Sequence, residues 1–160
     1  MPDTIPHPGQ RISTRSPWCG FVAGERRMNA EGHSRAVILC IDAKEAGTQL
    51  ELFKQVLEKA GYRVFAFTNA DEALQIFSQN HIDLVLTEHI VSTLTGAPKL
   101  TATFKRLKPD VPVAIYSADL AASPEDMQFA DTFITKLVPI DELLGTIEKL
   151  LTKGPLKAVG

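Results

Sequence analysis

The sequence predicts an α/β fold, a doubly wound parallel sheet of five strands with helices on both faces. The segment 37–41 is a continuous apolar run, which is typical of a strand that is buried on both faces of a sheet. Apolar residues recur at helical spacing in most segments between the predicted strands. Strands and helices therefore alternate along the chain, and this alternation favours parallel strands joined by right-handed crossovers.

The first part of this pattern contains three strands, over 37–41, 63–67 and 82–87. The helix between the first two strands is predicted by an apolar stripe made of Leu50, Phe53, Leu57 and Ala60. Gly61 follows this stripe, at the place where a glycine commonly ends a helix. Asn69 and Glu72 resemble a capping box. They predict the start of a second helix, whose apolar face carries Ala73, Leu74 and Phe77.

The second part contains strands over 111–116 and 132–135. Pro98 fits the first turn of a helix with an apolar side of Leu100, Phe104 and Leu107. A short, weakly patterned helix is predicted between residues 124 and 130. The clearest helical stripe is the last one, made of Ile140, Leu143, Leu144, Ile147 and Leu151.

Composition excludes several classes of protein. The chain has 160 residues, with 17 Lys and Arg against 19 Asp and Glu, and this balance gives no reason to expect nucleic-acid binding. The longest apolar run, 36–41, is far shorter than the roughly 20 residues that span a bilayer. Cys19 and Cys40 are the two cysteines, so a disulfide framework is not expected and a reducing, cytoplasmic compartment fits.

The chain divides into a domain over 35–153 and two flanking segments. Residues 1–34 are rich in Pro and Gly and lack apolar periodicity, so we expect a disordered extension that is dispensable for folding. The part of the sequence that resembles a folded domain begins near Met28, so residues 1–27 could reflect an upstream start codon. The alternative is a short recognition arm built on Trp18 and the Arg residues. Residues 154–160 are expected to form a flexible tail.

Polar residues follow four of the five predicted strands: Asp42, Glu88, Ser117 and Lys136. Because the carboxyl ends of parallel strands meet at one edge of a sheet, these residues should converge there. Two carboxylates could hold a divalent cation, while a hydroxyl and an ammonium could hold phosphate oxygens. Strand ends carry polar residues in any case, so this pattern alone leaves the question open.

The segment 37–151 resembles a response-regulator receiver domain of two-component signalling. The similarity rests on the order and spacing of "VILCID", "LEKAGYRVFAFTNADEALQIF", "IDLVLTEH", "PDVPVAIYSA" and "DTFITK". This resemblance implies a flavodoxin-like fold with strand order 2-1-3-4-5. It also implies a bacterial phosphorelay protein without enzymatic activity of its own.

The chain departs from the family pattern at several site positions. The family usually has two adjacent acids after the first strand, whereas this chain has Asp42 and Ala43. The family's phosphoacceptor is an aspartate at the position of Glu88. In the following loop Ile90, Val91 and Ser92 stand where Met-Pro is usual, and only Gly96 remains of a later Asp-Gly pair. The family's hydroxyl, lysine and switch aromatic are kept, as Ser117, Lys136 and Phe133, with the expected small Ala118 after the hydroxyl and Leu137 in place of a proline.

These departures predict an atypical, degenerate site. Asp42 and Glu88 are the remaining metal positions, together with a backbone carbonyl near Ile90, so we expect weak Mg²⁺ binding or none, and no other cofactor. Glu88 carries its carboxylate one methylene further out than aspartate does, which makes it a poor phosphoacceptor. We expect Glu88 to pair with Lys136 and Ser117 instead. Because a sheet edge is open to water, the predicted stabilisation is modest.

Three functions remain open from the sequence. The first is a stand-alone, phosphorylation-independent pseudo-receiver that acts through protein–protein interaction. The second is a working receiver that takes phosphate on Glu88 or on adjacent His89. The third is a small-molecule-binding doubly wound domain. The third lacks support, because no G-x-G-x-x-G follows the first strand, the histidines are scattered, and Cys40 reads as an inert core thiol.

The expected partner is a signalling protein, either a histidine kinase or a downstream effector. The resemblance implies an interaction surface around Phe133 and the predicted helix over 140–152. The polar side of that helix carries Asp141, Glu142, Glu148 and Lys149, which could equally be a plain solvated face. We expect no output domain after Lys153, and the residue pattern does not indicate an oligomeric state.

Overall fold

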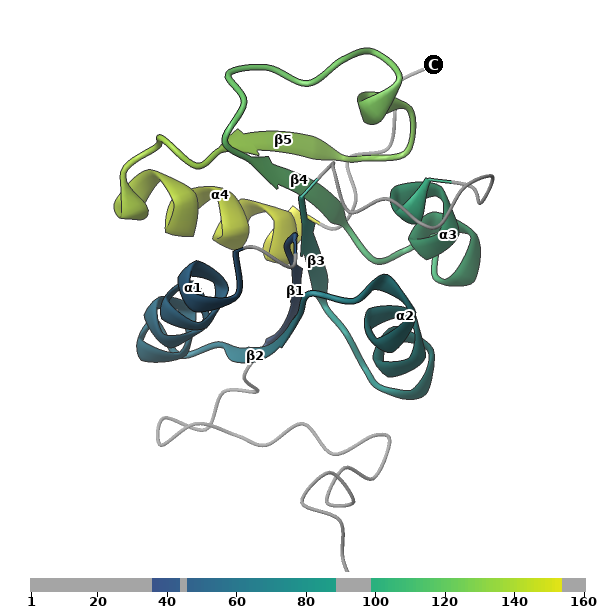
Figure 1. The fold of residues 1–160 in the computed structure, drawn as a ribbon, viewed down its shortest axis with the longest axis horizontal. Helices are drawn as coiled ribbons and strands as arrows, with labels where there is room; N and C mark the ends of the chain where they lie inside the picture. Colours follow the sequence, from purple (N-terminus) through teal and green to yellow (C-terminus); the bar gives the residue numbers. More distant parts are fainter. Residues whose placement is uncertain (1–35, 44–45, 89–98, 154–160) are drawn as a thin grey trace, which may run out of the picture.

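The computed structural model describes residues 36–43, 46–88 and 99–153. Five parallel strands form one sheet in the order β2-β1-β3-β4-β5 (Figure 1). This order confirms the predicted fold. The strands are β1 (Val37–Ile41), β2 (Arg63–Phe67), β3 (Leu84–Thr87), β4 (Val113–Ser117) and β5 (Thr132–Thr135).

Helices cover both faces of the sheet. They are α1 (Gly47–Lys59), α2 (Ala70–Gln79), α3 (Leu100–Leu107) and α4 (Ile140–Lys153). In Figure 1, α1 and α4 lie on one face, and α2 and α3 lie on the other. Strand β1 separates the two cores, because its alternate side chains point to opposite faces. Ile38 and Cys40 belong to the core under α1 and α4, whereas Val37, Leu39 and Ile41 belong to the core under α2 and α3.

The expected helix ends are present. The Asn69 side chain accepts hydrogen bonds from the backbone N–H groups of Asp71 and Glu72, at 2.8 and 3.2 Å, and so caps α2. Gly61 has a φ of +97°, a backbone conformation that side-chain-bearing residues rarely adopt. The chain can therefore leave α1 and enter β2 within three residues.

Two predicted strands have different bounds in the structure. The third starts at Leu84 rather than at residue 82, because Asp83 bonds to the first residue of β1 through its side chain as well as its backbone N–H. The fourth covers Val113–Ser117 rather than 111–116. It extends to Ser117 because the Ser117 carbonyl accepts a hydrogen bond from the Lys136 N–H at 2.7 Å.

The helix predicted between residues 124 and 130 was wrong in extent. Only one 3₁₀ turn, η2 (Asp126–Gln128), forms there. Ser123 and Asp126 make the reciprocal contacts of a helix start, at 2.6 and 3.1 Å. The helix does not continue, because Asp131 is drawn back to the sheet, where it exchanges hydrogen bonds with Val113.

Some sequence predictions lie outside the described residues. They concern the segment 1–34, the tail 154–160, Pro98 and the loop that follows Glu88, including His89. Among the helices that the structure describes, none combines the length and apolar character needed to cross a membrane.

Candidate functional site

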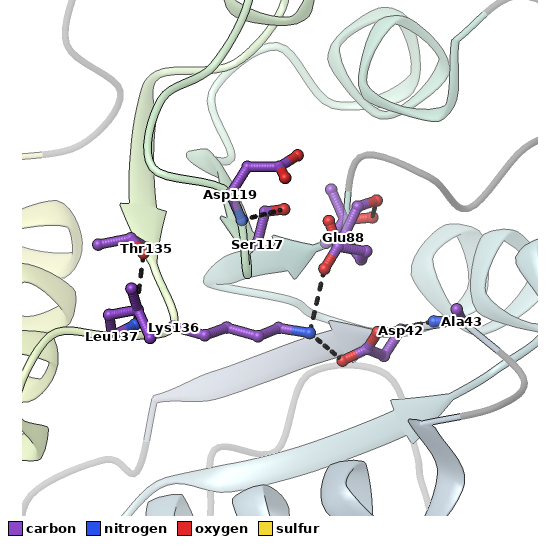
Figure 2. Close-up of polar contacts among 9 residues, drawn as sticks. Asp42, Ala43, Glu88, Ser117, Asp119, Thr135, Lys136 and Leu137 are labelled. Carbon is purple, nitrogen blue, oxygen red and sulfur yellow. Dashed lines mark hydrogen bonds and ion pairs between the residues drawn. The ribbon is translucent and has the colours of Figure 1, made fainter.

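The structure brings the four strand-end residues to the same edge of the sheet. Asp42 follows β1, Glu88 follows β3, Ser117 ends β4 and Lys136 follows β5. Figure 2 shows the Lys136 side chain extending across this edge toward Asp42 and Glu88. The convergence depends on the parallel sheet, which aligns the carboxyl ends of all five strands.

Lys136 bridges the two carboxylates. Its Nζ atom lies 2.6 Å from Asp42 Oδ2 and 3.1 Å from Glu88 Oε2. The pair expected between Glu88 and Lys136 is therefore present. Asp42 is a second and closer partner of the ammonium that the sequence interpretation did not include.

The cluster is more buried than expected for a sheet edge. Glu88 is 7% exposed, Asp42 is 8% exposed and Ser117 is 1% exposed. The expectation of a site open to water was wrong. Burial matters because ionic interactions strengthen when water is excluded, and a broken buried pair costs more than a broken surface pair.

Backbone hydrogen bonds fix the positions of these residues. The Glu88 N–H donates to the Ile41 carbonyl at 2.9 Å, and the Asp42 N–H donates to the Phe67 carbonyl at 3.2 Å. The N–H of Ala43 donates to Asp42 Oδ1 at 2.7 Å, which orients that carboxylate. Each side chain of the cluster therefore extends from backbone that is tied to a neighbouring strand.

Ser117 is held beside the ion pairs at the end of β4. Its Oγ accepts a hydrogen bond from the Asp119 N–H at 3.3 Å (Figure 2). Ala118, between these two residues, is exposed. The hydroxyl therefore lies at the sheet edge predicted from the sequence and also orders the first turn after β4.

The two carboxylates set the charge state of Lys136. Burial by itself lowers the pKa of the ammonium, but hydrogen bonds and charges from Asp42 and Glu88 outweigh this effect and raise it above its ordinary value of 10.5. Lys136 is thus a stable cation at neutral pH.

The donor set does not fit Mg²⁺. Both carboxylates point at the ammonium, Asp42 Oδ1 accepts from a backbone N–H, and the side chain at position 43 is a methyl group. Among the described residues, no three acidic, His or Cys side chains group together as metal ligands. Mg²⁺ requires near-octahedral oxygen ligation, and among the described residues both carboxylates are engaged by the ammonium instead.

One aromatic residue beside Lys136 was missed by sequence reasoning. The Lys136 Nζ atom lies 5.6 Å from the ring centroid of Tyr116, which is the residue directly before Ser117. Phe133, the expected switch residue, is half-buried on β5 opposite Ile115. The signal that could have identified Tyr116 is its position, one residue before the end of the strand next to β5.

Comparisons with known proteins agree with this fold. An alignment of 122 residues has 27% identity with the autoinducer 1 sensor kinase/phosphatase LuxN of Vibrio campbellii. It covers 76% of this chain but only 13% of that protein. A receiver domain protein (CheY-like) from Methanospirillum hungatei JF-1 has a TM-score of 0.63 at 26% identity, covering 75% of this chain and 96% of that one. The Thermotoga maritima response regulator TrrA, solved in complex with Mg²⁺-BeF, has a TM-score of 0.61 at 25% identity, covering 72% and 98%.

A family model for the response regulator receiver domain matches residues 38–148, which is most of the chain. Receiver domains are generally non-enzymatic signalling modules that interact with histidine kinases and effectors. The chain belongs to this family and is a receiver domain of two-component signalling.

Proposed function

We propose that this receiver domain works without phosphorylation, as a protein-interaction module of a two-component or phosphorelay system. One observation carries the proposal. The partly exposed Lys136 ammonium binds the buried carboxylates of Asp42 and Glu88 together, at 2.6 and 3.1 Å. The ion pairs themselves hold the strand ends in one arrangement, so no phosphoryl group is needed to do so.

The residues at the acceptor and metal positions support this proposal. Glutamate extends its carboxylate roughly 1 to 1.5 Å beyond the reach of aspartate, whereas a preorganised site tolerates errors of only about 0.5 Å. The Glu88 carboxylate already forms an ion pair with Lys136, and the methyl side chain of Ala43 supplies no oxygen ligand. Transfer of a phosphoryl group requires both an acceptor in line and a cation that neutralises the phosphate charge.

The proposed interaction surface runs around the edge strand β5, from Phe133 to the exposed side of α4. Asp141, Glu142, Glu148 and Lys149 are exposed on α4. Leu137 is 70% exposed and Ile140 is 43% exposed at the start of the helix, so apolar side chains accompany the charged ones. Exposed apolar side chains beside charged ones favour a protein-binding surface over a plain solvated face. The proposed partner is a histidine kinase or a downstream effector.

Treatment with acetyl phosphate tests the proposal directly. The donor would transfer its phosphoryl group to a carboxylate oxygen and release acetate. We expect no labelling of the wild-type chain by intact-mass spectrometry, with or without Mg²⁺, and negligible binding of beryllofluoride. Labelling on Glu88 or His89 would overturn the proposal and support a phosphorylatable regulator.

Two substitutions serve as the matched positive control. Ala43→Asp alone restores an oxygen ligand, and Glu88→Asp alone restores an acceptor of the usual length. Neither is expected to suffice, whereas the double variant should gain Mg²⁺-dependent labelling that exceeds the sum of the single changes. An unlabelled double variant would locate a further defect in the loop over residues 89–95.

Partner capture tests the interaction part of the proposal. A pull-down with residues 28–160 should recover the same binding protein with and without acetyl phosphate. Charge reversal at Glu148 and Lys149 on α4 should reduce that recovery. Charge reversal at Asp71 on α2, which packs on β1 and β2 away from the edge strand β5, should not. Recovery that requires the phosphodonor would contradict the proposal.

A further inference from the structure

Tyr116 lies where the ionic cluster meets the core under α1 and α4. Its ring packs against that core, and the Lys136 ammonium is 5.6 Å from the ring centroid. A cation at this distance from an aromatic face is attracted by the negative face of the ring. Lys136 is therefore held by the Tyr116 ring as well as by Asp42 and Glu88.

The other contact of the Tyr116 ring leads to α1. Phe53 of α1 stacks on Tyr116, with the ring centroids 4.8 Å apart and an angle of 18° between the ring planes. Stacked rings in a packed core shift together, because interiors have few voids into which one ring could move alone. A continuous chain of contacts thus runs from the strand-end cluster through β4 to a helix.

We propose that Tyr116 is a positioning residue for Lys136 and that it transmits the state of the ionic cluster to α1 through Phe53. This inference rests on the proposed function, because it treats the ion pairs as the element whose arrangement matters. The route differs from the one that the family resemblance implies. Phe133 alternates with Ile134, which faces α1 and α4, so Phe133 faces the opposite side of the sheet.

The electrostatics of Tyr116 agree with this coupling. Burial raises the pKa of the Tyr116 phenol, and the positive charge of Lys136 acts in the opposite direction. The nearby Asp42 carboxylate acts in the same direction as burial. Lys136 and Tyr116 therefore interact electrostatically as well as through the contact between the ammonium and the ring.

Hydrogen exchange in the full-length chain tests the inference. Lys136→Met removes the cation, and α3 serves as an internal control because it packs on the other face of the sheet. We expect amide exchange in α1 to accelerate on the order of three- to tenfold more than exchange in α3. Equal acceleration in both helices would indicate general destabilisation and would overturn the inference.

Two substitutions of Tyr116 distinguish the effect of its aromatic face from simple filling of the core. Tyr116→Phe keeps the aromatic face, so the difference between α1 and α3 on adding Lys136→Met should persist. Tyr116→Leu keeps an apolar side chain but removes the face, so that difference should disappear. If Tyr116→Leu leaves the difference intact, Tyr116 is only a packing residue and the inference is wrong.

A measurement in the reverse direction covers the case in which Lys136→Met does not fold. Coupling between two sites is reciprocal, so a change at Phe53 must also alter Lys136. Phe53→Leu should shift the Lys136 Cε resonance in a ¹³C-lysine spectrum, whereas Leu52→Ala, at a neighbouring residue that is 59% exposed, should not. Equal shifts from both variants would overturn the inference. Neither experiment uses a phosphodonor, so its outcome is independent of the labelling result.

Discussion

Two lysines pair with aspartates at opposite ends of the sheet, and both contacts measure 2.6 Å. At the carboxyl end, Lys136 binds Asp42 and also reaches Glu88. At the amino end, Lys105 of α3 binds Asp131, which precedes β5. Distance alone therefore does not distinguish a candidate site from a structural contact.

The other partners of each lysine differ. Lys105 donates to the backbone carbonyl of Val111 at 3.0 Å, and Asp131 accepts from the backbone N–H of Val113 at 2.7 Å. These contacts tie α3 and β5 to the start of β4. Lys136 instead joins side chains from three strand ends that are far apart in the sequence. The first arrangement secures a connection, whereas the second gathers charged side chains at the edge where this fold binds its ligands.

Removing the cation at the carboxyl end should have the largest effect on stability. Lys136→Met leaves two buried carboxylates without their shared ammonium, and breaking a buried pair in this way typically costs 3 to 5 kcal/mol. Because the lysine is partly exposed, we expect about 3 kcal/mol from urea unfolding curves. A loss below about 1 kcal/mol would show that the cluster behaves as a surface ion pair.

The equivalent change at the amino end should cost less. Lys105→Met leaves Asp131 with the hydrogen bond from Val113, so the carboxylate keeps a described partner. We expect about 2 kcal/mol, the range of one hydrogen bond to a charged group. The same unfolding measurement checks it. If Lys105→Met were the more damaging change, the amino end and not the carboxyl end would depend more strongly on its lysine.

Two substitutions of Glu88 distinguish the effect of its charge from the effect of its shape. Glu88→Ala removes a carboxylate that is 3.1 Å from Lys136, and we expect a loss of about 1 to 2 kcal/mol. Glu88→Gln keeps an oxygen that can accept from the ammonium, while Asp42 continues to balance the charge, so it should cost less than half as much. Equal and negligible losses in the two variants would mean that the pair does not form in solution.

Alkaline pH should weaken the carboxyl end selectively. The folded state raises the pKa of Lys136 above 10.5, so the stabilisation from its charge is fully present below that value and is lost as the pH rises through the folded pKa. The stability difference between wild type and Lys136→Met should therefore be constant up to about pH 10 and shrink above it. Solvent screening keeps the change below about 1 kcal/mol. Taking the difference cancels the titration of Tyr62, and repeating the comparison in a Tyr116→Phe background removes that of Tyr116, whose pKa depends on Lys136. A gap that widened with pH would contradict the assignment.

Sequence reasoning located the strand ends but not their surroundings. Alternation of strands and helices determines that Asp42, Glu88, Ser117 and Lys136 share one edge, because parallel topology aligns strand ends. The ion pair between Lys136 and Asp42 depends on side-chain conformations across the sheet edge, which residue spacing does not encode. Burial of Glu88 depends on how the surrounding connections pack, and the pattern leaves that open. The Lys105–Asp131 pair and the Tyr116–Phe53 stack likewise depend on register between elements, so neither was predictable from residue types.

Truncation of the N-terminal segment should have the smallest effect, because the amino end of the sheet is secured within the described domain. The Arg63 N–H donates to the Ala36 carbonyl at 2.9 Å, and Asp83 exchanges two hydrogen bonds of 2.8 Å with Val37. A chain that starts at Arg35 retains all of these contacts. Thermal melts of 1–160 and 35–160 should therefore agree within a few degrees, which for a domain of this size corresponds to less than about 1 kcal/mol. A larger drop in Tm would mean that residues 1–34 pack on the domain, and the amino end would then owe part of its stability to that segment rather than to Asp83, Asp131 and their backbone partners.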